Sequence, residues 1–561
     1  MAEYPWLRNY DQGVPHTLEP YPSITFMDVV EKNAKERPNA AMMWFKGSTI
    51  SYGRFAELVN SLAKGLVAVG IKKGDCVALL MPNCPQIIIS QFAVWKAGGI
   101  VAQINPMYSD AELIHTLKDS GAKMAIVLTA FYDRVKKVQA QTDIKTVVAT
   151  SIKEYLSPFM RTVFTLLMEK KGGHRIELQK HDLWFQDVIK KHAADPLPAV
   201  AVSPKETALI LFSGGTTGTP KGVMHSHQGV IMNAMQIRAW FSPIIHGWVD
   251  KAVLLMPIFH GAGNWILIST VINPPLPQVI IANPRDVKDV LATIKKTKPS
   301  LFPGVASLFI ALMNYPDVKS GKIKFGSLKM CITAAAPLLV ETKKRWEGLT
   351  GGKIVEAYGL TESGILVMGP VVGKWKEGSV GMPTPDSLLK VVDLETGTKE
   401  LPLGETGEIL ASGRHLMQGY WRRPGATEEI FHDGWMYTGD VGHIDEDGYL
   451  FITSRKKELI KPSGHQVYPG EVEEVITQHP AVFEVSVAGI MDELQGEAVK
   501  AWVVLKPDMQ CTPQEIQDFC RRHLTAYKVP KYVEFRTELP KSMVGKVLRR
   551  ILQEEEAAKK K

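Results

Sequence analysis

The sequence predicts an α/β fold in which a large N-terminal domain precedes a smaller α+β C-terminal domain. Strand-like segments that are apolar throughout alternate with helical segments, which is typical of parallel sheets covered by helices on both faces. The length of 561 residues exceeds the usual size of one domain. Between residues 440 and 470, polar turns and charges replace the apolar segments. We therefore predict domains at residues 1–455 and 456–561.

The alternation is clearest near the start of the chain. Residues 77–81 form a continuous apolar run, a helix is expected at 86–96, and Gly98-Gly99 ends it before a second strand at 100–104. Further strands are expected in the N-terminal domain at 124–128, 146–149, 209–212, 253–256, 279–281, 329–332 and 353–356. In the C-terminal domain we expect strands at 484–490, 499–505 and 532–535 and a helix at 513–524.

Composition excludes several classes of protein. Hydrophobic residues make up 45% and charged residues 22%, which is ordinary for a soluble globular chain. The net charge of +8 is spread over the whole length, so it favours anionic ligands or acidic lipid surfaces only mildly. It is no nucleic-acid signature, and we expect no nucleic-acid partner.

The sequence also predicts a cytoplasmic protein. Its five cysteines, Cys76, Cys84, Cys331, Cys511 and Cys520, have no metal-ligand spacing and are expected to be reduced thiols. The N-terminus lacks a basic segment followed by an apolar one, so no secretory signal is expected. No apolar run is long enough to span a bilayer.

Residues 155–171 interrupt the α/β pattern, because they are first apolar and then basic. Two interpretations are open. The segment either lies on a membrane surface, which would make the protein peripheral at the inner membrane face, or forms a helix packed on its own domain. We favour the second interpretation.

A loop rich in glycine and threonine follows the apolar strand at 209–212. Glycines let the backbone approach a polyphosphate, while N–H groups and hydroxyls donate hydrogen bonds. It is not a Walker A loop, because Pro220 precedes its lysine and Gly222 follows it. A flexible surface connection is the other interpretation, but the position between a strand and a helix at 230–241 favours a nucleotide loop. The loop consists of Ser213, Gly214, Gly215, Thr216, Thr217, Gly218, Thr219, Pro220 and Lys221.

Four later motifs complete the set. Tyr358-Gly-Leu-Thr-Glu362 follows the strand at 353–356, at the end of a strand where α/β sheets hold ligands. Tyr437-Thr-Gly-Asp440 offers a carboxylate, Arg455 follows a turn-rich segment, and Lys546 comes directly after a glycine. Each signal is weak alone, since a single aspartate in a turn is often structural and a lysine in a basic tail is often solvated. Their joint occurrence in this order is specific.

Together these motifs resemble those of the adenylate-forming acyl-CoA synthetase superfamily, over nearly the whole chain. Within it, the sequence is most similar to bacterial long-chain fatty acid–CoA ligases. The resemblance implies a large multi-sheet N-terminal domain, a small mobile C-terminal domain and an active site between them. It also implies a two-step reaction, in which carboxylate and ATP give acyl-adenylate and pyrophosphate before coenzyme A displaces AMP. The subgroup similarity is carried by Pro5-Trp-Leu, Val14-Pro-His-Thr17, Leu80-Met-Pro-Asn-Cys-Pro85 and Ala526-Tyr-Lys-Val-Pro530.

The resemblance assigns the nucleotide-binding residues. It implies that the loop from Ser213 to Lys221 surrounds the β- and γ-phosphates, Thr361 contacts the α-phosphate and Glu362 binds Mg²⁺. A hard oxygen ligand suits that metal. The ribose would be bound by Asp440 and Arg455, and the adenine enclosed by Ala335, Ala336, Pro337, Tyr358 and Gly359.

The resemblance also assigns residues to the two chemical steps. Lys546 would bridge the attacking carboxylate and the nucleotide in the first step, and His260 would lie beside the acyl carboxylate. A core histidine is the other interpretation of His260. Lys457 would be the hinge about which the C-terminal domain rotates before the second step. Ser463, Gly464 and His465 would then help to form the channel for the pantetheine arm of coenzyme A.

The chain departs from the family's pattern in two places. Ala334 and Ala335 stand where relatives often have glycines beside the acyl pocket, which leaves the acyl chain length open. Ser454 and Glu458 stand where many long-chain relatives have aspartates, a difference that the sequence does not explain.

We therefore predict an AMP-forming acid–CoA ligase for a medium- or long-chain fatty acid. One alternative is an aromatic or alicyclic acid, with the reaction run towards ATP. A second is a module that loads a carrier protein, which the absence of a carrier domain after Lys561 disfavours. A third is a catalytically dead nucleotide-binding regulator, which the intact motifs disfavour. A monomer and a homodimer are equally compatible with the sequence.

Overall fold

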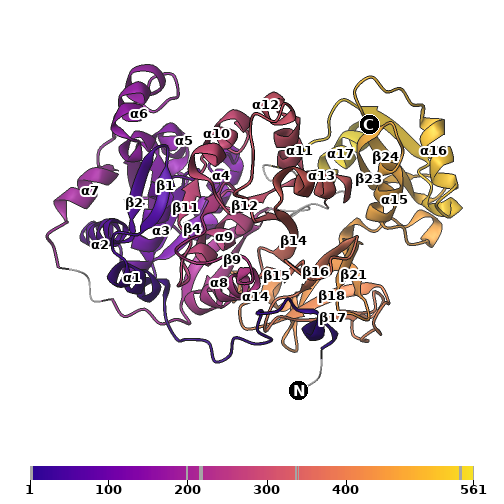
Figure 1. Ribbon diagram of the computed structural model, residues 1–561, viewed down its shortest axis with the longest axis horizontal. Helices are drawn as coiled ribbons and strands as arrows, with labels where there is room; N and C mark the ends of the chain where they lie inside the picture. Colours follow the sequence, from indigo (N-terminus) through magenta and orange to yellow (C-terminus); the bar gives the residue numbers. More distant parts are fainter. Residues whose placement is uncertain are drawn as a thin grey trace.

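The computed structural model describes residues 4–196, 200–213, 219–334, 338, 340–542 and 546–559. Over these ranges the chain is a mixed α/β protein with a large N-terminal part and a smaller C-terminal domain (Figure 1). The described strands form a fourteen-stranded, an eight-stranded and a three-stranded sheet. The predicted fold class is confirmed.

The eight-stranded sheet contains the first predicted strands. Its order is β19-β9-β8-β4-β3-β5-β6-β7, and the pairs from β8 to β7 are parallel. Strands β3 and β5 are buried along their whole length, as expected of strands covered on both faces. The bounds are β3 Cys76–Leu80, β4 Ile100–Gln103, β5 Met124–Leu128, β6 Thr146–Thr150, β7 Leu183–Trp184, β8 Thr207–Ser213, β9 Lys221–Ser226 and β19 Gly419–Tyr420.

One element of this sheet differs from the sequence prediction. A helix was expected directly after the glycine-threonine loop, but strand β9 comes first and pairs with β8 in antiparallel orientation. The short alternating segment at 221–226 gave too little periodicity to predict it. The loop therefore joins two strands of a hairpin, and the helix follows the second strand.

The fourteen-stranded sheet has a parallel and an antiparallel half. Strands β1 and β10 to β14 pair in parallel, whereas β14 to β18 and β20 to β22 pair in antiparallel fashion. Strand β14 belongs to both halves. The bounds are β1 Ala41–Phe45, β2 Ser48–Ser51, β10 Ala252–Leu254, β11 Gln278–Ile280, β12 Leu301–Gly304, β13 Met330–Thr333, β14 Lys353–Leu360, β15 Gly364–Met368, β16 Ser379–Pro383, β17 Leu388–Val392, β18 Gly407–Ser412, β20 Phe431–His432, β21 Trp435–Ile444 and β22 Leu450–Arg455.

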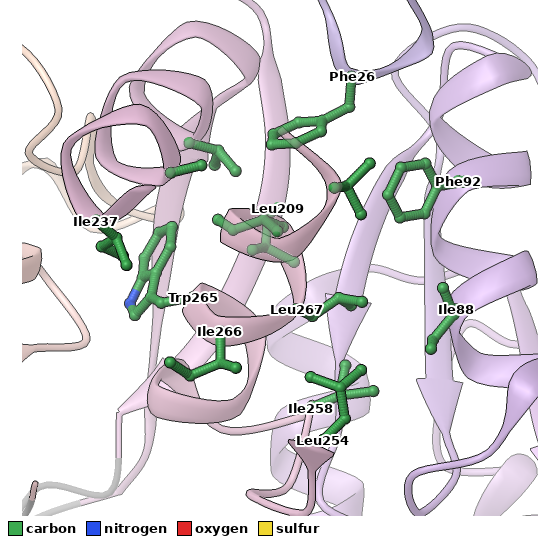
Figure 2. Packing of buried hydrophobic residues seen from close by; sticks show 14 of the residues in the cluster. Phe26, Ile88, Phe92, Leu209, Ile237, Leu254, Ile258, Trp265, Ile266 and Leu267 are labelled. Atoms are coloured by element: carbon green, nitrogen blue, oxygen red, sulfur yellow. The ribbon is translucent and has the colours of Figure 1, made fainter. Parts of the chain in front are cut away.

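Helices that are apolar on every side fill the core shared by the two large sheets. Helix α3 (Pro85–Lys96) and helix α9 (Gly261–Val271) are buried on nearly all their residues, as such helices must be. Figure 2 shows Phe92 of α3 and Leu267 of α9 around the same core as Leu209 of β8. One hydrophobic cluster therefore holds both sheets together.

Helix α8 (His227–Phe241) is also largely buried and packs against α9 in this core. Most of the other helices of the N-terminal part are amphipathic and lie over the sheets (Figure 1). Their bounds are η1 Pro5–Asn9, α1 Phe26–Glu36, α2 Tyr52–Ala68, α4 Asp110–Ser120, α5 Thr129–Gln139, η2 Ile152–Tyr155, α6 Pro158–Val163, η3 Phe164–Met168, α7 Phe185–Lys191, α10 Val287–Thr297, α11 Ala306–Asn314, α12 Pro316–Lys319, α13 Val340–Thr350 and α14 Pro424–Glu428.

The C-terminal domain has a hydrophobic core of its own. Val472 and Ile476 of α15 pack with Val487, Val503 and Ile516. The sheet order is β23-β24-β25, with an antiparallel and then a parallel pair. The elements are η4 Lys456–Glu458, η5 Pro462–Gly464, α15 Pro469–Thr477, β23 Val482–Asp492, β24 Gly496–Leu505, α16 Pro513–Arg521, η6 Ala526–Lys528, β25 Tyr532–Arg536 and α17 Arg549–Lys559.

No helix in the described ranges combines the length and the apolar character needed to cross a bilayer.

Candidate active site

A buried carboxylate on β21 is contacted by side chains from two other strands of the same sheet, β14 and β22. Asp440 of β21 is 3% exposed, and each of its oxygens has a partner. Tyr358 Oη on β14 donates to Oδ2 at 2.7 Å, and Arg455 Nε on β22 lies 3.0 Å from Oδ1. Strand register places Asp440 directly opposite Arg455. The fold therefore brings these three residues together, although almost a hundred positions separate Tyr358 from Arg455 in the sequence.

Burial acts on the pKa of every residue in this group, which we call the Asp440 cluster (Asp440, Tyr358 and Arg455). It raises the pKa of Asp440, an effect that Arg455 and Tyr358 oppose. Burial and the neighbouring carboxylate raise the pKa of Tyr358 well above its ordinary value, so its hydroxyl stays a donor. For Arg455, burial acts to lower the pKa, but Asp440 and Glu458 outweigh it and the pKa rises.

Lys546 of the C-terminal domain is near enough to the Asp440 cluster to act on it electrostatically. Its charge acts on Asp440, and its own pKa is lowered by burial and then by the positive charge of Arg455, while Glu458 and Asp440 oppose this. The backbone around it is fixed by a pair of hydrogen bonds with Ser542, at 2.8 and 3.2 Å. The structure thus brings the predicted catalytic lysine to the predicted ribose-binding residues.

An ion-pair clamp holds the lysine's segment. Arg549, three residues after Lys546, donates to Glu473 Oε2 of α15 at 2.7 Å and also pairs with Glu458. Glu473 in turn accepts from the N–H of Val487 at 2.7 Å. The clamp (Arg549, Glu458 and Glu473) ties Lys546 to the turn after β22, and it gives Glu458 a structural partner that the sequence did not reveal.

Sequence reasoning missed Arg549 and Glu473. Arg549 stands at the end of the same motif as Lys546, and that short spacing was the available signal. Nothing in the sequence indicated Glu473.

Tyr420 connects the end of the glycine-threonine loop to Glu362. Its hydroxyl donates to Glu362 Oε1 at 2.9 Å, and Lys221 Nζ lies 4.9 Å from the centre of its ring. Lys221 stands opposite Ser213 in the hairpin, with Ser213 Oγ 3.4 Å from the Lys221 carbonyl oxygen. Sequence reasoning missed Tyr420, an aromatic residue in the turn-rich stretch before α14.

Thr361 and Glu362 are positioned by contacts on both sides. His225 Nε2 donates to the Thr361 carbonyl at 2.8 Å, and burial lowers the pKa of His225 to about 4, so the ring is neutral. Just before them, a Cβ on Gly359 would meet the Gly364 carbonyl oxygen at 1.9 Å. Only glycine therefore fits at residue 359.

His260 caps the N-terminus of α9 beside this segment. Its Nδ1 accepts from the N–H of Ala262 at 3.3 Å, and burial lowers its pKa, so the ring is neutral. The next residue, Gly261, is close to Thr361, because a Cβ built on it would lie 3.8 Å from the Thr361 Cα. His260 is thus a capping residue that neighbours the predicted phosphate-binding segment.

The predicted hinge and pantetheine residues lie on turns of the C-terminal domain. Lys457 is exposed in η4, directly after β22. Ser463 and Gly464 both have positive φ in η5, and His465 stacks on Tyr527 with a centroid distance of 4.6 Å. In this arrangement it is Lys546, not the turn at 463–465, that acts electrostatically on Asp440.

Eight predicted residues lie outside the described ranges: Gly214, Gly215, Thr216, Thr217, Gly218, Ala335, Ala336 and Pro337. Thr219 is described and exposed at the end of the loop.

The donor set fits Mg²⁺ bound largely through a nucleotide. In the part of the chain that the structure describes, no three His, Cys, Asp or Glu side chains gather as a metal site. Glu362 offers a single carboxylate. Mg²⁺ in nucleotide-dependent enzymes is commonly held by one or two carboxylates together with phosphates and water.

Comparison with known families identifies the family of the chain. The sequence model described as "AMP-binding enzyme" matches residues 30–421, and the one described as "AMP-binding enzyme C-terminal domain" matches residues 471–546. The chain belongs to the AMP-binding enzyme family. As predicted, it is an acyl-CoA synthetase of the AMP-forming type, and both matched segments agree with the two parts seen in the fold.

Individual members of the AMP-binding family resemble the chain over almost its whole length. A long-chain-fatty-acid–CoA ligase of Bacillus subtilis (strain 168) is 37% identical, with 99% of this chain and 98% of that protein covered. ATP-bound MatB from Rhodopseudomonas palustris superposes with a TM-score of 0.83 at 27% identity, covering 96% and 100% of the two chains. The anthranilate CoA ligase AuaEII with anthranoyl-AMP gives a TM-score of 0.82 at 26% identity, covering 96% and 98%.

Proposed function

We propose that this enzyme activates a medium- or long-chain fatty acid with ATP and transfers the acyl group to coenzyme A. In the first step a carboxylate oxygen attacks the α-phosphorus of ATP, and the bond to the β-phosphate oxygen breaks to release pyrophosphate. In the second step the sulfur of coenzyme A attacks the acyl carbon and AMP leaves. The observation that carries the proposal is the Asp440 cluster, in which Tyr358 Oη and Arg455 Nε each contact one oxygen of a buried carboxylate, with Lys546 near enough to act on that carboxylate electrostatically.

Lys546 acts in the first step. Two anionic groups must approach one another, so a cation between them stabilises the transition state more than the separated reactants. The clamp at Arg549 orients this cation by fixing the segment that carries it. Because a lysine on a movable domain can be withdrawn, the same site can then admit a thiol.

The Asp440 cluster holds the nucleoside. The two oxygens of Asp440 suit the two hydroxyls of a ribose, with Arg455 holding the carboxylate in place and Tyr358 lying beside the adenine. Thr361 would donate to the α-phosphate and the loop from Ser213 to Lys221 would surround the outer phosphates. Mg²⁺, bound by Glu362 and the phosphates, would neutralise charge on the pyrophosphate leaving group.

We further propose that residues 1–455 and 456–561 move as two bodies about Lys457. Strand β22 ends at Arg455, and the small domain has its own core, so a rotation between them breaks little packing. Rotation would withdraw Lys546 and bring Ser463, Gly464 and His465 to the pantetheine arm. His260 would remain beside the acyl carboxylate.

The acid is proposed from the relatives. The Bacillus subtilis protein named as a long-chain-fatty-acid–CoA ligase shares more of the sequence than the aromatic-acid ligase AuaEII does, at 37% against 26% identity. Acids of this length partition into bilayers, so we also propose peripheral contact with a membrane surface.

A pyrophosphate-release assay across butyrate, decanoate, palmitate, benzoate and cyclohexanecarboxylate tests the acid. We expect decanoate or palmitate to give the highest kcat/KM. A preference for a ring acid over both would overturn the proposed substrate and favour the aromatic or alicyclic alternative. Release of no pyrophosphate with any acid, together with tight ATP binding, would favour the nucleotide-binding regulator.

A further inference from the structure

Five large apolar side chains are exposed together on one short helical segment. Helix α6 and the π-helical turn η3 run from Pro158 to Met168. Phe159 is 75% exposed, Leu166 77% and Leu167 68%, and Met160 and Met168 are also exposed. The spacing of seven residues from Phe159 to Leu166 and from Met160 to Leu167 is about two helical turns, so these residues share a face. We call this face the α6 patch.

Polar contacts and one inward-facing aromatic side chain fix the segment to its domain. Arg161 Nη2 donates to the Glu154 carbonyl oxygen at 2.6 Å, and Glu169 pairs with Lys153 at 2.5 Å. Phe164 packs inward against His174, with ring centroids 5.1 Å apart. The segment therefore lies against its own domain, as the favoured interpretation of the sequence had it, but its remaining apolar side chains face outward. A large exposed apolar patch usually marks a site that a partner or a membrane covers.

The charges around the α6 patch are predominantly positive. The exposed acidic side chain within residues 158–180 is Glu177, since Glu169 is buried in its ion pair. Five basic side chains in the same stretch are exposed, namely Arg161, Lys170, Lys171, Arg175 and Lys180. An apolar face beside exposed lysines and arginines is complementary to an anionic bilayer, which offers acyl chains beneath negative headgroups.

The position of the patch leaves the enzyme free to work. In Figure 1, α6 projects from one end of the N-terminal part, and the C-terminal domain lies at the other end. A surface bound at α6 would thus not obstruct a rotation of the small domain. The Asp440 cluster, on β14, β21 and β22, would also stay accessible to ATP and coenzyme A.

We propose that the α6 patch docks the enzyme on an anionic lipid bilayer, with Phe159, Leu166 and Leu167 inserted at the boundary between headgroups and acyl chains. The flanking lysines and arginines lie over the headgroups. The proposal rests on the proposed function in one respect: it names the surface from which an acid that partitions into lipid would be taken. Docking itself requires neither acid nor ATP.

Cosedimentation of the full-length protein with vesicles tests the docking. We expect binding to vesicles of equal parts phosphatidylglycerol and phosphatidylcholine, and weaker binding to phosphatidylcholine alone or at raised salt. Replacing Leu166→Ser and Leu167→Ser together should lower the partition coefficient by about tenfold or more, because two inserted side chains are lost. The matched control is Leu494→Ser, which changes an 88% exposed leucine in the C-terminal domain and should leave binding unchanged.

A second variant keeps the apolar residues and changes the charges. Lys170→Glu with Lys171→Glu should weaken binding to the anionic vesicles and remove most of its salt dependence. All variants should release pyrophosphate from a soluble acid at the wild-type rate, which shows that they are folded. Because the vesicle assay contains no acid, a wrong substrate proposal leaves its result untouched.

Two results would overturn the proposal. One is binding of the Leu166→Ser, Leu167→Ser variant as tight as that of the wild type, or no binding of the wild type at all. The other is a wild-type dimer in sedimentation velocity that this variant dissociates, without any vesicle binding, because a second copy of the chain would then cover the patch.

Discussion

The Asp440 cluster and the Lys546 segment meet at one site but are built in different ways. Asp440, Tyr358 and Arg455 stand on three strands of one sheet, and Asp440 and Arg455 face one another in register. Lys546 stands outside the strands, next to Val547, which forms a bridge with Lys541, and the Arg549 clamp holds this segment. A sheet position cannot move without breaking its ladder, whereas a clamped segment can leave as a unit with its own domain.

The difference separates two tasks. In the proposed reaction, binding of the nucleoside is required in both half-reactions, which suits residues fixed on strands. The proposed role of Lys546 is required only in the first half-reaction, which suits a residue on a domain that we propose to move. Substitutions on the two sides of this comparison should therefore affect the two half-reactions differently.

Replacing Lys546 is expected to have the largest effect on the reaction rate. Lys546→Ala should lower the rate of acyl-adenylate formation by about 10²–10³-fold, because one oriented charge is lost from the transition state. Thioester formation from supplied acyl-adenylate should change little. Single-turnover pyrophosphate release and acyl-CoA formation measure the two steps separately. An equal loss in both would mean that the lysine does not act in one step alone.

The second largest effect is expected from replacing Asp440, which is fixed on a strand. Asp440→Asn should raise the KM for ATP by about 10–100-fold, because an uncharged amide replaces a carboxylate that accepts two hydrogen bonds. Binding of the acyl-adenylate should weaken in the second step as well. Tyr358→Phe is the matched control, since it keeps the ring and should cost less. A defect confined to the first step would contradict the assignment of Asp440 to a rigid nucleoside site.

A smaller effect is expected on the clamp. Arg549→Met should lower the adenylation rate by about tenfold, because Lys546 loses its fixed orientation, and should spare the second step. Arg550→Met is the neighbouring control, because Arg550 pairs with Glu554 at the exposed surface of α17. Circular dichroism melting reports whether either variant unfolds the small domain. Equal activities of the two variants would remove Arg549 from the positioning of Lys546.

The smallest effect is on the pH profile. Burial lowers the pKa of Lys546, and the lysine acts while protonated, so kcat/KM for adenylation should fall as the pH rises through that lowered pKa. The fall should begin below the pH at which an exposed lysine titrates. Lys546→Arg should flatten the profile at a lower rate, because a guanidinium does not lose its proton in this range. A profile in the wild type that stays flat up to the ordinary lysine pKa would contradict the buried location.

Much of this protein follows from short stretches of sequence. The buried parallel strands, such as β3 and β5, were predictable because local apolar runs determine them without help from distant residues. Strand β9 was missed because six residues carry too little periodicity to distinguish a strand from the start of a helix. Asp440 and Lys546 were predicted as site residues because the motifs that contain them occur in the same order as in a known superfamily.

The tertiary structure alone determined which of these residues meet. Tyr420 joins Lys221 to Glu362, and Glu473 holds Arg549, through contacts between residues far apart in the chain, to which no local pattern points. The same holds for the α6 patch. The sequence of residues 155–171 specified an apolar and basic segment, but whether Leu166 and Leu167 are covered depends on what the rest of the fold offers them. Here the fold supplies polar anchors beneath the segment and leaves its apolar side exposed.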